Sequence, residues 1–143
     1  MADSHGELKK KAEAFYVAYN RRDWDGVFAD ADPEVEWDPV EENVTYRGRP
    51  AILEYFERWL DAWVDFRVEL EELVFTPDED RMFSAVRYVG RSPESDVESD
   101  GHFFAVLELR DGRWWRGKEY ADRSEAWAAF ERRGATAQTS PRN

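Results

Sequence analysis

The sequence predicts a single α+β domain in which helices pack on one face of an antiparallel sheet. Apolar residues recur with helical spacing through most of the first half of the chain, and they alternate as in strands from residue 66 to residue 121. Helices followed by a run of strands are typical of α+β proteins, whereas a regular alternation of the two would indicate a parallel sheet. With 143 residues the chain suits one domain, which we place at residues 1–134, followed by a disordered tail at residues 135–143.

The first helix is expected over residues 5–20. Ser4 and Glu7 have the spacing of a capping box, in which the two residues satisfy free N–H groups of the first turn. The apolar residues of this helix share one face: Leu8, Ala12, Phe15 and Tyr19. Asp23 is expected to cap a second, short helix that ends before residues 30–33.

A short strand pair and a third helix are expected next. Around Trp37, apolar and acidic residues alternate as in a strand, and Pro39 ends the regular pairing because it lacks an N–H. Residues 44–47 are the expected hairpin partner. Pro50 suits the first turn of a helix, and a broad apolar face predicts that this helix covers residues 50–64.

Long antiparallel strands are expected in the second half of the chain. The first begins at Phe66, and the others cover residues 82–91, 102–110 and 113–121, with a polar loop at residues 92–101. Asp111-Gly112 joins the last two strands, because this pair tolerates the positive φ angles of a type I′ turn. Asp122 or Ser124 can cap a last helix that ends at Gly134.

The composition limits the partners of this acidic protein. A net charge of -12 disfavours nucleic acids and anionic membranes, so we expect a neutral or cationic small molecule. The absence of Cys excludes disulfides and thiolate chemistry, and two His among scattered carboxylates show no metal-ligand spacing. We therefore expect neither a metal nor a cofactor. No secretory signal or membrane-spanning apolar run is present in the sequence, which favours a cytoplasmic protein.

Four short phrases carry a resemblance to a known family: Trp37-Asp38-Pro39, Tyr46-Arg47-Gly48, Asp111-Gly112-Arg113 and Tyr120-Ala121-Asp122-Arg123. Together with the order of elements over residues 8–122, they resemble the SnoaL-like and ketosteroid isomerase-like branch of the nuclear transport factor 2-like superfamily. The resemblance implies a cystatin-like α+β barrel, in which N-terminal helices pack on the concave face of a cone-shaped, curved antiparallel sheet. It also implies a small-molecule pocket, but the superfamily includes isomerases, cyclases, dehydratases and non-catalytic proteins, so the fold alone does not define an activity.

Asp38 and Glu119 are the candidate catalytic carboxylates. The resemblance matches Asp38 to the general base of ketosteroid isomerases, and burial beside Trp37 would raise its pKa. The alternative is a solvated turn residue, because strand alternation turns Asp38 away from Trp37 unless Pro39 marks a bulge. Glu119 is expected either inside the pocket or at its rim, paired with an arginine.

The pocket wall is expected to be aromatic. The two groups that stabilise the oxyanion in ketosteroid isomerases fall on Phe15 and near Ala105, so the resemblance does not extend to steroid isomerisation by that route. Parity along the elements and the pocket positions of the family indicate the following lining residues: Phe15, Tyr16, Tyr19, Trp37, Trp59, Trp63, Phe103, Ala105, Trp115 and Gly117. For the helical tryptophans, a place in the core is the alternative.

Two functions stay open at this point. In the first, the protein binds a small apolar or aromatic molecule in a hydrophobic pocket and transfers protons with a carboxylate base, as an isomerase, polyketide cyclase or dehydratase. In the second, it is a non-catalytic ligand carrier or a dimeric interaction module. A homodimer is expected through the outer face of the sheet, which would present His102, Phe104, Val106, Trp114 and Arg116.

Overall fold

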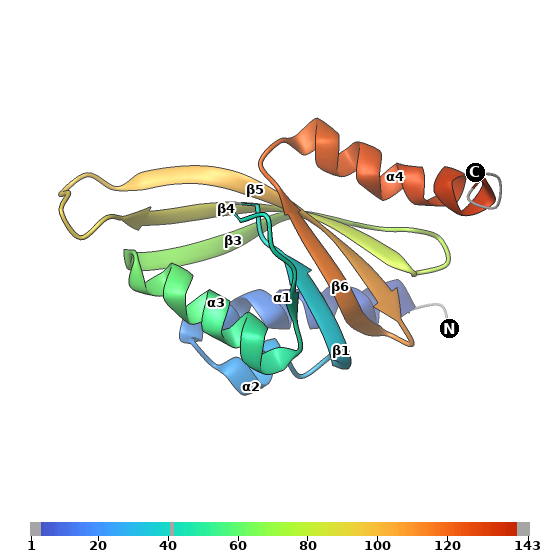
Figure 1. Cartoon of the computed structure of the whole chain (residues 1–143), viewed down its shortest axis with the longest axis horizontal. Helices are drawn as coiled ribbons and strands as arrows, with labels where there is room; N and C mark the ends of the chain where they lie inside the picture. The colour runs from blue at the N-terminus through green and yellow to red at the C-terminus, as the bar shows by residue number, and fades with distance from the viewer. Residues whose placement is uncertain (1–3, 41, 140–143) are drawn as a thin grey trace.

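The computed structural model describes residues 4–40 and 42–139, with side chains as far as residue 131. The α+β class is confirmed: an N-terminal helix packs against a mostly antiparallel sheet (Figure 1). The helices are α1 (Ser4–Arg21), α2 (Trp24–Val27), α3 (Arg49–Asp61) and α4 (Arg123–Thr139). The strands are β1 (Ala31–Asp38), β2 (Tyr46–Arg47), β3 (Val64–Phe75), β4 (Arg81–Arg91), β5 (Ser99–Arg110) and β6 (Arg113–Tyr120).

The sheet has six strands in the order β2-β1-β6-β5-β4-β3. All neighbouring strands are antiparallel except β1 and β6, which pair in parallel. These two are the first and the last strand along the chain. Asp111 and Gly112 have φ angles of 56° and 76°, so the turn between β5 and β6 has the positive values expected of a type I′ hairpin.

Several element boundaries differ from those expected; α3, for example, ends at Asp61 and not at residue 64, and β3 already begins at Val64. β1 begins at Ala31, in a segment where the sequence predicted a break, because Pro33 lies at the edge of the regular pairing with β6. β5 begins at Ser99, because its ladder with β4 continues to Gly90; the predicted loop over residues 92–101 is therefore too long. α4 continues past Gly134 to Thr139, and residues 140–143 of the predicted tail lie outside the described residues.

Helices cover both faces of the sheet (Figure 1). α1, α2 and α3 lie on the concave side, where Asn20 ties α1 to β3 by donating to the carbonyl of Val68 and accepting from its N–H, both at 2.9 Å. α4 lies on the opposite side and packs Ala126 and Phe130 against Phe83.

The position of α4 corrects the surface proposed for a dimer. Val106, which was expected to face a second subunit, is buried in the cluster beneath α4. Trp114 faces the other way, into the main core. His102 and Arg116 stay on the outer surface, where they pair with Glu71 and Glu36. The homodimer itself stays a prediction.

Candidate functional site

An aromatic cone lies between α1, α3 and the concave face of the sheet. Its lining residues are Phe15, Tyr16, Tyr19, Trp37, Tyr55, Phe56, Trp59, Val68, Phe103, Ala105 and Glu119. The free volume inside this cone is only about 30 Å³, which is room for very few water molecules. The aromatic rings therefore fill most of the space that the sequence suggested for a ligand.

Most of the predicted wall residues lie around this cone, but three do not line it: Trp63, Trp115 and Gly117. Trp63 lies beyond the end of α3 and packs against Trp59, Phe66 and Tyr88 instead.

A β-bulge explains the error at Trp115. Glu108 pairs with Arg116 and Leu109 pairs with Trp114, so Trp115 is an extra residue in β6. The bulge turns Trp114 into the core, where it is only 6% exposed. The ring of Trp115 contacts two guanidinium groups instead, with its centroid 4.4 Å from Cζ of Arg110 and 5.4 Å from Cζ of Arg116. Strict alternation along β6 could not reveal this change of face.

Gly117 lies behind the wall and supports the ring of Trp37. A Cβ atom at this position would lie 2.5 Å from Cζ3 and 2.6 Å from Cε3 of Trp37, which is closer than real Cβ contacts. Only a glycine lets the indole lie directly on the backbone of β6. Trp37 also contacts Phe56 and Trp114 edge-to-face, with centroid distances of 5.6 and 5.7 Å.

Asp38 lies on the side of β1 opposite to Trp37. Strand alternation continues through this position, and Asp38 accepts a hydrogen bond from Thr45 Oγ1 at 2.5 Å. It lines neither the cone nor the larger cavity described below. Asp38 is therefore the last residue of β1 and lies on the outward side that strand alternation indicated, away from the pocket.

Glu119 is the candidate carboxylate that does line the cone. Its Oε1 atom accepts a hydrogen bond from the backbone N–H of Val40 at 3.1 Å, so the segment after β1 holds the carboxylate in place. The hydroxyl of Tyr16, on the opposite wall, lies 3.2 Å from Oγ of the fully buried Ser84. The sequence indicated Tyr16 only as a wall residue. No pattern in the sequence indicated that Ser84 on β4 would position its hydroxyl.

The pKa of Tyr16 is strongly perturbed. Burial of the hydroxyl raises this pKa to about 12; the hydrogen bond with Ser84 opposes the shift, and the negative charge of Glu119 adds to it. Tyr16 therefore stays protonated at neutral pH and can act as a hydrogen-bond donor. Tyr16 and Glu119 thus place a neutral hydrogen-bond donor and a carboxylate in the same, largely aromatic cone.

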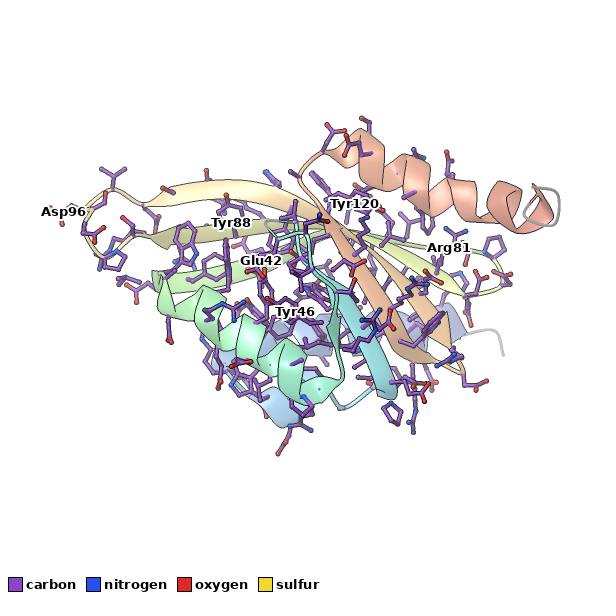
Figure 2. All side chains as sticks on the ribbon, viewed as in Figure 1. Glu42, Tyr46, Arg81, Tyr88, Asp96 and Tyr120 are labelled. Atoms are coloured by element: carbon purple, nitrogen blue, oxygen red, sulfur yellow. The ribbon has the colours of Figure 1, made fainter. Side chains whose placement is uncertain are left out.

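A polar network holds the segment between β1 and α3 beside the cone. Tyr46 donates to Glu42, and Arg58 donates to the hydroxyl of Tyr46 at 2.7 Å (Figure 2). The ring of Tyr46 stacks on Tyr55 of α3 at a centroid distance of 5.2 Å. Since Tyr55 lines the cone, this network fixes one wall from outside.

A much larger cavity of about 530 Å³, which we call the groove, lies between α1, α2 and the β5–β6 turn. Its apolar floor includes Met82, Leu107 and Trp114. Four charged residues also line it: Lys11, Arg21, Asp23 and Asp30. The groove and the cone share Phe15, Tyr16 and Trp37, so these aromatic side chains separate the two spaces.

The sequence analysis missed the groove. The signal that could have indicated it is the row of small residues on α1, since Ala12, Ala14 and Ala18 all line the groove. Six further helices and strands (α2, β1, β3, β4, β5 and β6), together with turns between elements, contribute the remaining walls, and their meeting depends on long-range packing. Lys11 bridges the rim by an ion pair with Asp30 at 3.8 Å.

The described residues contain neither a metal-binding cluster nor a membrane-spanning helix. No group of three or more His, Asp or Glu side chains there is arranged to hold a metal ion. In the same residues, no helix is long and apolar enough to cross a membrane.

Comparison with known proteins identifies the family. The model of the SnoaL-like domain matches residues 12–117, which is most of the chain, and the chain therefore belongs to the SnoaL-like domain family. No curated protein sequence matches it.

Solved structures with the same fold include proteins from three bacteria. A nuclear transport factor 2-like protein from Burkholderia thailandensis is 20% identical, with a TM-score of 0.69, and the match covers 87% of this chain and 96% of that chain. A protein of ketosteroid isomerase-like fold from Catenulispora acidiphila, in complex with trimethylamine, is 14% identical, with a TM-score of 0.69 and coverage of 82% and 89%. A Mycobacterium tuberculosis protein in complex with estradiol-17beta-hemisuccinate is 13% identical, with a TM-score of 0.67 and coverage of 82% and 95%. At these identities the similarity shows the nuclear transport factor 2-like fold.

The contact between Trp37 and Gly117 predicts a specific loss of stability. Gly117→Ala should lower the free energy of unfolding by about 1–3 kcal/mol, because the added methyl group displaces the indole ring. Urea denaturation monitored by circular dichroism measures this change. In a Trp37→Leu background the same substitution should cost less, since the clashing ring atoms are gone. An equal cost in both backgrounds would show that the methyl group is unfavourable for another reason.

The raised pKa of Tyr16 predicts a pH dependence of stability. Because its folded pKa of about 12 lies above the ordinary value of 10.0, the folded protein holds this proton more tightly than the unfolded chain does. The resulting stabilisation is complete below pH 10 and is lost as the pH rises toward 12. Urea denaturation at intervals from neutral to alkaline pH should therefore show a steeper loss for the wild type than for Tyr16→Phe. Parallel curves for the two proteins would contradict the shift.

Proposed function

We propose that this protein binds a small, predominantly apolar molecule in the groove between α1, α2 and the β5–β6 turn. The observation that carries the proposal is the groove itself, whose volume of about 530 Å³ lies within the range of small-molecule sites, roughly 300–1,000 Å³. Its floor of Met82, Leu107 and Trp114 offers dispersion contacts and removes apolar ligand surface from water. The cone, by contrast, has room for little more than water.

Known complexes of this fold support a small-molecule function in general. The proteins from Catenulispora acidiphila and Mycobacterium tuberculosis are in complex with trimethylamine and estradiol-17beta-hemisuccinate, respectively. Our proposal for this chain concerns the class of ligand and not those compounds. Binding in the groove is sufficient for a non-catalytic carrier, which is the simplest form of the proposed function.

A second candidate function is proton transfer, favoured by the pairing of Glu119 and Tyr16 in one apolar cone. In this function Glu119 takes a proton from a C–H group next to a carbonyl, and the Tyr16 hydroxyl donates a hydrogen bond to the oxyanion that develops. We assign the base to Glu119 and not to Asp38, because Asp38 lies on the opposite side of β1. A substrate must displace the aromatic side chains shared with the groove before it contacts Glu119.

A volume-filling substitution tests the binding proposal. 1-Naphthylmethanol is a suitable neutral apolar probe, and isothermal titration calorimetry measures its affinity. Leu107→Trp should weaken binding at least about tenfold, because the larger ring occupies the floor of the groove. Leu109→Trp provides a second variant from a partly buried lining position. Val97→Trp is the matched control, since Val97 is 71% exposed in the loop between β4 and β5.

Each outcome of this titration is informative. Loss of binding in the groove variants alone, with circular dichroism spectra like that of the wild type, supports the proposal. Absence of binding to the wild type, or equal affinity for the wild type and both groove variants, overturns it.

Isotope exchange tests the second function. In deuterated buffer, the wild type should accelerate exchange of the methyl hydrogens of 2-acetylnaphthalene, which are acidic because they lie next to a carbonyl. Glu119→Gln should lower the protein-dependent rate by about 10²–10⁴-fold, because the amide cannot accept the proton. Nuclear magnetic resonance follows the loss of the methyl signal. If exchange in the presence of the wild type is no faster than in buffer alone, the proton-transfer function is wrong, and groove binding is unaffected.

A further inference from the structure

The indole nitrogen of Trp37 is a buried hydrogen-bond donor without an acceptor in the described part of the chain. Its Nε1 atom makes no hydrogen bond within residues 4–40 and 42–139. The side chain is only 5% exposed, so bulk water does not reach this nitrogen either. A buried N–H without an acceptor loses the hydrogen bonds that water gives it in the unfolded chain, and such donors are rare in folded proteins. The N–H of Trp37 therefore requires an explanation.

Other polar side chains around the cone do have partners. The hydroxyl of Tyr16 lies 3.2 Å from Oγ of Ser84. Glu119 accepts a hydrogen bond from the backbone N–H of Val40 at 3.1 Å. The packing of the interior thus provides for these groups, and the donor of Trp37 differs from them.

The neighbours of the Trp37 ring cannot supply a good acceptor. Cε3 and Cζ3 are the ring atoms next to Gly117, and Nε1 lies on the opposite side of the indole, so the N–H points away from that contact. The rings of Phe56 and Trp114 contact Trp37 edge-to-face. Their side chains carry no oxygen, and an aromatic face is at best a weak acceptor.

The donor belongs to a wall of the groove. Trp37 lines the groove and packs against Trp114, which forms part of the floor. A molecule bound in the groove therefore lies against the side chain that carries the unmatched N–H. Because Nε1 itself is covered, an acceptor contacts it only when the indole turns or a neighbouring ring moves.

The surroundings favour a neutral acceptor. Trp37 also lines the cone that contains Glu119, whose negative charge already contributes to the raised pKa of Tyr16. This carboxylate and the net charge of -12 both repel an anionic group. A carbonyl oxygen suits the site, because it is uncharged, has two lone pairs and brings no donor of its own.

We propose that the ligand of the groove carries a carbonyl group, such as that of a ketone or an ester, whose oxygen accepts a hydrogen bond from Nε1 of Trp37. This inference rests on the proposed binding function of the groove and adds the chemical class of the ligand. It does not depend on proton transfer by Glu119. Trp37 is then a specificity-determining residue, because a hydrocarbon of the same shape leaves the donor unmatched.

Two probes that differ in one group test this preference. 2-Acetylnaphthalene carries the carbonyl, and 2-isopropylnaphthalene has a methyl group in place of the oxygen. Equilibrium dialysis measures the Kd of each probe. Water solvates the ketone better than the hydrocarbon, so the informative quantity is the ratio of the two Kd values, compared between the wild type and a variant.

Replacement of Trp37 by its benzothienyl analogue removes the donor alone, since sulfur takes the place of the N–H in the same fused ring system. The ketone should then bind about three- to tenfold more weakly, which corresponds to the loss of one net hydrogen bond, and the affinity of the hydrocarbon should stay the same. The matched control is the same replacement at Trp114, which also lines the groove and should leave the ratio unchanged.

Unfolding of the ligand-free proteins gives an independent measurement. The replacement at Trp37 should leave the urea midpoint unchanged or raise it, because exchanging an unmatched donor for an apolar group of the same shape is neutral or favourable. A lower midpoint would show that the N–H already has an acceptor, such as a bound water molecule, and would overturn the proposal.

Proton–nitrogen correlation spectra follow the donor in the unmodified protein. The indole signal that is absent from the spectrum of the Trp37 analogue identifies this residue. Binding of 2-acetylnaphthalene should move its proton signal to lower field, as formation of a hydrogen bond does, by more than binding of 2-isopropylnaphthalene. Equal shifts with both probes would contradict the proposal.

The results separate this inference from the function on which it rests. If both probes bind and the replacement of Trp37 leaves the ratio of Kd values unchanged, the role of Trp37 is wrong and groove binding stands. The same conclusion follows if only the replacement of Trp114 changes the ratio, because Trp114 is then the donor. If neither probe binds to the wild type, the function of the groove falls and the inference falls with it.

Discussion

The close contact of Trp37 with the backbone at Gly117 is the constraint on which the interior depends. Because residue 117 has no side chain, the indole can lie flat against β6 and still contact Phe56 on α3 and Trp114 on the same strand. This position makes Trp37 the boundary between the two internal spaces. On one side the rings close the cone around Glu119, and on the other side the groove stays open.

Features determined by local chemistry could be predicted from the sequence. The apolar face of α1, the Asp111-Gly112 turn and the alternation of β5 between the two faces of the sheet each depend on neighbouring residues, and the structure agrees with all three. The side of β1 on which Asp38 lies also follows from local alternation along the strand. The family resemblance was sufficient to define the fold.

Features determined by distant parts of the chain could not be predicted in the same way. The parallel pairing of β1 with β6 joins residues about eighty positions apart, and no short pattern indicates it. The bulge at Trp115 exchanges the roles of two adjacent tryptophans, because one extra residue in a strand reverses the faces that follow. The groove depends on the meeting of α1 with several strands and turns, so its walls are scattered through the sequence. The volume of a cavity depends on how side chains pack against one another, and a pattern of residue types does not determine it.

The β3–β4 and β5–β6 turns line a hollow of about 370 Å³ with Asp78, Glu79, Asp80 and Asp111, and this has a consequence for how the protein could change. The shape of the β5–β6 turn depends on the backbone freedom of Gly112 and on a position that Asp or Asn occupies equally well. The carboxylates there contribute little to the hydrophobic interior. Mutation could therefore reverse the charge of these turns over evolutionary time, or in a redesigned variant, while the helices and the sheet kept their sequence and their stability.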